Sequence, residues 1–149
     1  MPRAPTVKEN AAATAWRHIF DYIIATAPDR VAVLDRLGLT PAESRSLVSL
    51  DPKAGRSMRS LADEWRCDPS NATWLVDRLE HQGLARRIAR DGDRRVKAVV
   101  LTAKGKRLRS ELLASQYTPP RDLLSLPQRD LEALSAAASK LPARRRILD

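Results

Sequence analysis

The sequence has a single cysteine, Cys67, and only two histidines among its 149 residues. One cysteine cannot form a disulfide within the chain, and these three side chains make no ligand cluster for zinc or a redox metal. No structural metal and no other cofactor is therefore expected. A glycine-rich phosphate loop, a nucleophile elbow and a spaced set of carboxylates and histidines are also missing, so the chain is not expected to be an enzyme.

Long hydrophobic runs are missing as well, and residues 1–10 contain no apolar segment that would serve as a secretory signal. We therefore expect no membrane span and a cytoplasmic location. No strongly basic amphipathic helix with a bulky apolar face is present, which argues against binding at a membrane surface. Aromatic residues make up only 4% of the chain, and no strand interleaves them with basic residues as proteins that stack RNA bases do.

Positive charge, in contrast, is in excess. Lysine and arginine number 27 against 18 aspartates and glutamates, which gives a formal net charge of +9. Such a balance favours a polyanionic partner, and nucleic acid is the first candidate. The hydrophobic content of 43% is enough for the core of a single domain of this length.

Residues 68–83 have the pattern of one short amphipathic helix. Asp68 is placed to cap it, Pro69 suits the first helical position, and Gly83 suits the turn at its end. One face is apolar, at three- and four-residue steps: Ala72, Leu75, Val76 and Leu79. The other face presents Ser70, Asn71, Thr73, Trp74, Asp77, Arg78 and His81. A short helix with polar groups near its N-terminus fits the major groove of duplex DNA.

A basic hairpin is predicted directly after this helix. Two strand-like runs, residues 84–88 and 98–101, flank a turn that contains Asp91-Gly92. From Arg86 to Lys97 six basic residues stand against two acidic ones. We expect such a finger to be drawn to phosphates, with an arginine at its tip suited to a narrow minor groove. Asp93 would hold a neighbouring guanidinium in place.

The remaining helices are predicted from periodicity and caps. A long apolar helix spans about 7–27, ends or kinks at Pro28, and is followed by a second piece, capped by Asp29, that runs to Gly38. Thr40, Pro41 and Glu43 form a capping box that begins a helix to about residue 50. Further helices are expected over 57–66, from Thr102, with Arg109 on its outer face, and over 127–141.

We predict a mainly α fold with a small β-wing, in which a winged helix-turn-helix core is flanked by N- and C-terminal dimerisation helices. Within this single domain of residues 1–149, the N-terminal dimerisation region spans 7–37, the winged helix-turn-helix 39–101 and the C-terminal dimerisation helices 102–149. The terminal helices carry more apolar surface than the core can cover. A two-fold dimer would bury it and would place two recognition helices about 34 to 36 Å apart on DNA.

Several motifs in this order resemble the MarR family of winged helix-turn-helix regulators along nearly the whole chain. They are Leu37-Gly38-Leu39-Thr40, Ser60-Leu61-Ala62, Pro69-Ser70, Leu75-Val76-Asp77-Arg78-Leu79-Glu80, Gly83-Leu84, Asp93-Arg94-Arg95 and Leu101-Thr102-Ala103-Lys104-Gly105. The resemblance implies a homodimer that binds double-stranded DNA at a palindromic operator. It also implies a repressor that releases DNA when a small, often aromatic, ligand binds between the dimerisation and DNA-binding parts.

The resemblance assigns roles residue by residue. Ser70, Asn71, Thr73, Trp74 and Arg78 would face the major groove, Arg94 would enter the minor groove, and Asp93 with Arg95 would fix the wing. The full set of candidate DNA contacts is Ser57, Ser70, Asn71, Thr73, Trp74, Arg78, Arg86, Asp93, Arg94, Arg95 and Lys97. Trp16 and Phe20 are candidate ligand-binding residues, with dimer packing as the alternative.

Other interpretations stay open at this level. Trp74 departs from the family pattern, which more often has a small or basic residue there, and it is suited to core packing as well as to contact with thymine methyls. Arg78 could simply pair with Asp77 or Glu80 on the surface. The basic hairpin, taken alone, could be a solvated loop. At the level of function, a winged-helix protein-interaction module and a small-molecule-binding protein with non-specific DNA affinity are the alternatives.

Overall fold

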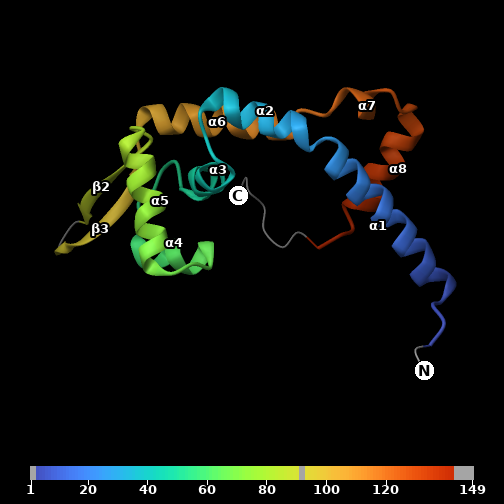
Figure 1. Ribbon diagram of the computed structural model, residues 1–149, viewed down its shortest axis with the longest axis horizontal. Helices are drawn as coiled ribbons and strands as arrows, with labels where there is room; N and C mark the ends of the chain where they lie inside the picture. Colours follow the sequence, from blue (N-terminus) through green and yellow to red (C-terminus); the bar gives the residue numbers. More distant parts are fainter. Residues whose placement is uncertain (1–2, 91–92, 143–149) are drawn as a thin grey trace.

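The computed structural model describes residues 3–90 and 93–142, and the side chains of 3–89 and 97–142 (Figure 1). A compact lobe contains α3, α4, α5 and the sheet, whereas α1, α7 and α8 lie at the opposite end of the molecule (Figure 1). Helices α2 (Ala27–Leu37) and α6 (Ala103–Tyr117) contact each other and join the two ends. The predicted fold class, mainly helical with a small β-wing, is confirmed.

Helices α1 (Val7–Ala25) and α2 are two pieces of the predicted N-terminal helix. Thr6 and Glu9 form a capping box at the start of α1. The joint falls at Thr26, and Pro28 lies in the first turn of α2, where its missing N–H costs no helical hydrogen bond. The prediction that Asp29 caps the second piece is wrong, because Thr26 holds the cap position and Asp29 lies within the first turn.

The capping signals in the middle of the chain are mostly confirmed. Helix α3 (Pro41–Ser49) begins with the capping box of Thr40 and Glu43. Helices α4 (Met58–Trp65) and α5 (Pro69–His81) follow. Asp68 occupies the cap position of α5, but its side chain accepts no capping hydrogen bond. Gly83 has a φ of +69°, a left-handed conformation that favours glycine.

The sheet is antiparallel, with the strand order β1–β3–β2. Strands β2 (Ala85–Arg90) and β3 (Asp93–Leu101) form the predicted hairpin, in a register that pairs Ala85 with Leu101. The two-residue strand β1 (Arg56–Ser57) was not predicted, because a segment this short has no periodicity. It pairs with Val99 and Ala98 of β3, so the hairpin is attached to the start of α4.

The core of the lobe is built from the apolar faces predicted for these elements. Its fully buried side chains include Leu47 of α3, Leu61 of α4, Val76 and Leu79 of α5, and Val99 of β3. All four residues of the stripe predicted for α5 are buried, at no more than 8% exposure. The hydrophobic effect therefore fixes which face of α5 is turned to the solvent.

The start of α6 is hydrogen-bonded to the end of α5 through the motif Leu101-Thr102-Ala103-Lys104-Gly105. The Thr102 hydroxyl donates to the carbonyl of Gly83 at 2.7 Å and accepts from the Gly105 N–H. A Cβ atom at Gly105 would collide with the carbonyl group of Leu84, so this position requires glycine. Lys104 Nζ also donates to the carbonyl of Gln82 at 2.8 Å.

The C-terminal part differs from the prediction in three details. Arg109, expected to point outward from α6, donates from Nε to the Val48 carbonyl at 3.0 Å. A short helix α7 (Arg121–Leu124) follows Pro119-Pro120, where a simple interruption was expected. Helix α8 (Gln128–Ala138) is shorter than the predicted span of 127–141.

Candidate nucleic-acid interface

Helices α4 and α5 form a helix-turn-helix. Ser57 caps α4, and its hydroxyl accepts from the Ser60 N–H at 3.1 Å. Arg66 ends α4 in the left-handed conformation at φ 51°, and the Cys67 N–H then donates to the Ala62 carbonyl at 3.2 Å. Only three residues, 66–68, separate α4 from α5. Because the Ser57 oxygen accepts the capping hydrogen bond, its hydroxyl hydrogen would be the donor in any contact with a partner molecule.

The solvent face of α5 presents the predicted polar side chains. Ser70, Asn71, Thr73 and Trp74 are all exposed. The Thr73 hydroxyl donates to the Pro69 carbonyl at 2.8 Å, which leaves its lone pairs outward. Trp74 is 54% exposed, so packing in the core of this chain is ruled out for it. Contact of the apolar indole surface with water is unfavourable, so covering Trp74 with a partner would lower the free energy.

Arg78 is held by a buried carboxylate on another helix. Its Nε donates to Glu43 Oε1 at 2.9 Å, and Gln82 Nε2 donates to the same oxygen at 3.2 Å. Glu43 is 1% exposed, whereas the Arg78 side chain is 47% exposed. The interpretation that Arg78 pairs with Asp77 or Glu80 is therefore wrong. With Nε bound to Glu43, a contact between Arg78 and a partner molecule would use the two terminal nitrogens of the guanidinium.

The environment of Glu43 keeps it ionised. Burial raises the pKa of Glu43, but the hydrogen bonds from the Thr40 N–H and Arg78 outweigh burial and leave the pKa below its ordinary value. The Thr40 N–H donates to Glu43 Oε2 at 2.8 Å. Glu43 thus completes the capping box of α3 and also binds Arg78 and Gln82 at the C-terminal end of α5.

Asp77 and Glu80 instead bind the wing. Arg87 of β2 forms ion pairs with both carboxylates, at 2.7 Å to Asp77, and its backbone N–H donates to Glu80 Oε1 at 2.7 Å. The Arg87 side chain is only 19% exposed. One arginine of the basic hairpin therefore fixes the wing to α5. This role was not predicted, because the spacing of Arg87 in the sequence does not separate it from the neighbouring arginines.

The other described basic residues of the wing are exposed. Arg86 of β2 and Lys97 of β3 both lie at the surface. The backbone of residues 93–95 belongs to β3. The side chains of Asp93, Arg94 and Arg95 lie outside the described residues, so the minor-groove finger and the wing-fixing pair stay predictions.

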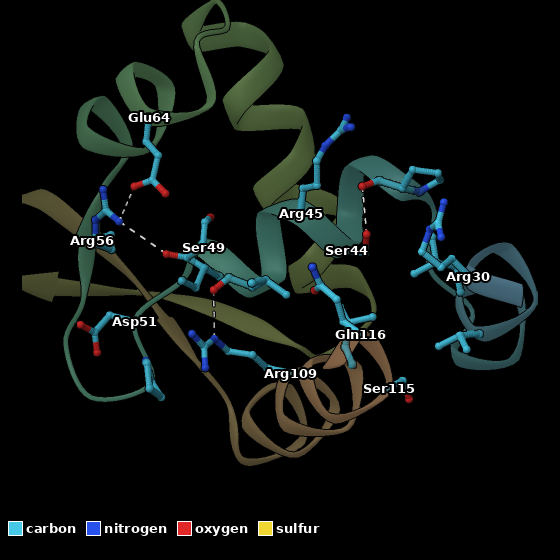
Figure 2. Close-up of a pocket in the computed structure, with 17 residues that line it drawn as sticks. Arg30, Ser44, Arg45, Ser49, Asp51, Arg56, Glu64, Arg109, Ser115 and Gln116 are labelled. Atoms are coloured by element: carbon cyan, nitrogen blue, oxygen red, sulfur yellow. Dashed lines mark hydrogen bonds and ion pairs between the residues drawn. The ribbon is translucent and has the colours of Figure 1, made fainter. Parts of the chain in front are cut away.

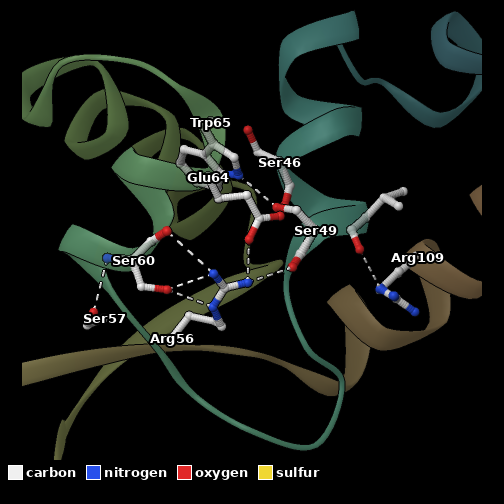
Figure 3. A network of polar contacts seen from close by, with 9 residues as sticks. Ser46, Ser49, Arg56, Ser57, Ser60, Glu64, Trp65 and Arg109 are labelled. Carbon is white, nitrogen blue, oxygen red and sulfur yellow. Dashed lines mark hydrogen bonds and ion pairs between the residues drawn. The ribbon is translucent and has the colours of Figure 1, made fainter. Parts of the chain in front are cut away.

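A polar network holds α3, β1 and α4 together (Figure 3). Arg56 donates from Nε and Nη2 to the Ser60 hydroxyl at 2.9 and 2.7 Å, and it forms an ion pair with Glu64 at 2.6 Å. Trp65 Nε1 donates to the Ser49 hydroxyl at 2.7 Å. Both partners of the Arg56–Glu64 pair are mostly buried, so the network sets the position of the helix-turn-helix relative to α3.

A pocket of about 560 Å³ lies behind the helix-turn-helix, between α2, α3 and α6 (Figure 2). Its lining includes Arg30, Val33, Val48, Arg109 and Leu112. The two candidate ligand residues do not line it. Trp16 and Phe20 are on α1, 61% and 49% exposed, with their ring centroids 6.0 Å apart.

No helix in the described part of the chain is long and apolar enough to cross a membrane. Within residues 3–90 and 93–142, no three histidine, cysteine, aspartate or glutamate side chains are grouped so that they could hold a metal ion.

Comparison with known proteins identifies this architecture. Residues 39–97, from the end of α2 through most of the hairpin, match the model of the MarR family. The matched segment contains the whole helix-turn-helix of this chain.

One relative is similar in sequence, and solved structures share the fold. The HTH-type transcriptional repressor MdtR of Bacillus subtilis is 32% identical over 89 residues, which are 60% of this chain and 57% of MdtR. The chain thus spans little more than half of that relative's length. The YusO protein of Bacillus subtilis has a TM-score of 0.77 at 23% identity, covering 95% of this chain and all of YusO. MepR of S. aureus, in a complex with DNA, has a TM-score of 0.62 at 19% identity, covering 84% and 99%.

Proposed function

We propose that this MarR-family protein is a dimeric, sequence-specific DNA-binding repressor that recognises a palindromic operator. The observation that carries the proposal is the exposed face of α5, with Ser70, Asn71, Thr73 and Trp74, beside a wing on which the basic residues Arg86 and Lys97 are exposed. Polar side chains at the N-terminal half of such a helix read base edges in the major groove, whereas basic residues on the wing bind phosphates. The Arg78–Glu43 and Arg87–Glu80 pairs hold both elements in a fixed arrangement before DNA arrives.

The dimer is inferred from the unpaired apolar surface of the terminal helices. Large apolar side chains are exposed along α1 and on and after α8, among them Trp16, Phe20, Ile24, Leu134 and Leu141. We infer an interface from this concentration of exposed large apolar side chains on the terminal helices. We assign residues 7–37 and 102–149 to dimerisation and 39–101 to DNA binding. Two copies related by a two-fold axis would present two copies of α5 to one face of the duplex.

Relief of DNA binding by a small ligand completes the proposal. The pocket is lined by Arg56 and Glu64 and by residues of α2 and α6. A bound ligand would therefore contact the two helices that join the ends of the molecule. A repressor of this kind acts on chromosomal DNA, which places it in the cytoplasm of a bacterial cell.

A binding titration tests the proposed function. The purified protein is titrated with DNA from upstream of its own gene and with shuffled DNA of equal length, at near-physiological salt. Preference for the native DNA by a factor of about a thousand or more is expected of a specific regulator. Equal, weak binding to the upstream DNA, to other candidate operators and to shuffled DNA would favour a protein-interaction module. Sedimentation of the free protein tests the dimer.

A further inference from the structure

Trp74 lies in the middle of the solvent face of α5. It belongs to a row of exposed residues spaced at steps of four, three and four, which share the side of the helix opposite the buried stripe. The row consists of Ser70, Trp74, Asp77 and His81. Asn71, one turn before Trp74, is exposed as well. An indole therefore occupies the centre of the surface that the proposed function turns toward the major groove.

Trp65 and Trp74, the two tryptophans of the helix-turn-helix, have different surroundings. Trp65 is partly buried against the core, and its Nε1 donates to the Ser49 hydroxyl at 2.7 Å (Figure 3). Trp74 is 54% exposed and lines a hollow of about 400 Å³ between α3 and the helix-turn-helix. Within the described part of the chain, its Nε1 has no hydrogen-bond partner. Packing within this chain therefore does not account for an indole at position 74.

The charge around Trp74 favours DNA as the molecule that covers it. In residues 58–89 and 97–101, the exposed cationic side chains are Arg59, Arg66, Arg78, Arg86 and Lys97. The exposed carboxylates of the same residues are Asp63, Asp68 and Asp77. Asp77 also pairs with Arg87, which compensates its charge. The cores of protein–protein interfaces are depleted of charged residues, so an indole within a cationic surface is better suited to a polyanion than to another protein.

Only one of the four bases presents a methyl group in the major groove. Thymine carries it at C5, whereas the other base edges are read through hydrogen-bond donors and acceptors. We propose that Trp74 reads a thymine in each half of the operator by packing its ring against the C5-methyl group. The inference rests on the proposed function and deepens it, because it assigns one base preference to one side chain. Ser70 and Asn71 carry hydrogen-bonding groups and read different features of the bases.

The size of the effect follows from the apolar surface of one methyl group. Loss of a buried group of this size weakens binding by a factor of about four. The proposed dimer would read the same base in both half-sites, and well-separated contacts contribute independently, so loss of both methyl groups should weaken binding about fifteenfold. Thr73 is the competing reader, because its side chain is exposed on α5 and carries a methyl group.

The test removes the methyl group without changing any hydrogen-bonding group of the base. The operator is identified by selection from random DNA, and each thymine is then replaced by deoxyuridine, symmetrically in both half-sites. Affinity for the full-length protein is measured by fluorescence anisotropy, at a salt concentration low enough for weak complexes to be measured. We expect a position at which deoxyuridine weakens binding about fifteenfold, as worked out above from one methyl group in each half-site. No loss at any position would overturn the proposal.

Variants of the protein assign the effect to one side chain. In Trp74→Ala the loss caused by deoxyuridine should disappear, whereas Trp74→Phe, which keeps an apolar ring but has no N–H, should retain most of it. Thr73→Ser is the matched control, because it removes the methyl group of Thr73 and keeps the hydroxyl that donates to the Pro69 carbonyl. The full loss should remain in this variant. If deoxyuridine weakened binding as much in Trp74→Ala as in the wild type, or if the effect vanished only in Thr73→Ser, Trp74 would not be the reader.

An added methyl group gives the converse test. At the same position, a cytosine–guanine pair is compared with a 5-methylcytosine–guanine pair, which differs only by a methyl group at the place where thymine has one. The wild type should bind the methylated DNA about fifteenfold more tightly, by the same methyl-group arithmetic, and Trp74→Ala should bind the two DNAs equally. Equal affinity of the wild type for both DNAs would contradict the proposal.

The outcomes separate this inference from the proposed function. If selection yields no preferred sequence and the protein binds all DNA equally, the proposed function fails and the inference fails with it. If an operator is bound specifically but the methyl substitutions act alike on the wild type and on Trp74→Ala, only the inference fails. Circular dichroism of each variant checks that its helices are intact, as expected for a change at a residue that is 54% exposed.

Discussion

Replacement of Glu43 by alanine gives the sharpest test of how α5 is held. The side chain is 1% exposed and accepts hydrogen bonds from the Thr40 N–H, Arg78 and Gln82. Loss of the capping interaction is worth about 0.5–1 kcal/mol. A fully buried charge-assisted hydrogen bond from Arg78 would stabilise the protein by about 2 kcal/mol. Because the Arg78 side chain is 47% exposed, water screens this interaction and we expect a contribution of about 1 kcal/mol. Alanine also leaves a buried cavity, which has its own cost. Together, these losses should lower the free energy of unfolding by about 2–3 kcal/mol.

The assay is urea unfolding, followed by far-UV circular dichroism at pH 7 and at lower pH. Glu9 provides a matched control, since it completes the same type of capping box at the start of α1 but has no buried partner. Glu9→Ala should therefore destabilise the protein much less than Glu43→Ala. Glu43→Gln, which keeps the size of the side chain, separates the contribution of the charge from that of the volume.

The pH dependence has a defined sign. The pKa of Glu43 is lowered from 4.5 in the folded protein, so its contribution is fully present above pH 4.5 and is lost as the pH falls through the folded-state pKa. The gap between wild type and Glu43→Gln should accordingly shrink on acidification below pH 4.5. If Glu43→Ala cost no more than Glu9→Ala, or if the gap stayed constant down to pH 3, the anchoring of α5 by Glu43 would be refuted.

The other predictions concern DNA binding and assembly. Arg94→Ala should weaken operator binding and lower the salt slope by about one unit, and an unchanged affinity would remove this residue from the wing contact. Asn71→Ala should change the preferred bases in a selection from random DNA, because its amide can pair with adenine; the same selected sequence would show that Asn71 reads no base. Trp74→Ala should change thermal stability by no more than about 0.5 kcal/mol, since the side chain is 54% exposed, but weaken operator binding; a large loss of stability would contradict its surface position. If the protein forms the proposed dimer, Phe20→Glu should convert it to monomers in sedimentation, and a persistent dimer would place the interface elsewhere.

Local signals in the sequence were sufficient for most of the helices and for the apolar face of α5. The caps at Thr40 and Thr102, the proline at position 69 and the glycine at position 83 act within one turn of the backbone, so they can be recognised without knowledge of the fold. Hydrophobic periodicity then determined which side of α5 is buried and which side remains for DNA. The order of these motifs also indicated the family.

Contacts between distant segments could be decided only by the tertiary structure. Arg78 has nearer carboxylates in the sequence at Asp77 and Glu80, yet its partner is Glu43, 35 residues away, because the packing of α3 against α5 puts that carboxylate beside it in a buried site. Arg87 takes the two nearer carboxylates because the hairpin folds back onto α5. The same holds for the pocket, whose walls come from α2, α3 and α6. Caps and periodicity depend on neighbours a few residues apart, whereas ion pairs and pockets depend on which surfaces the hydrophobic core brings together, and that information is not local to any segment of the chain.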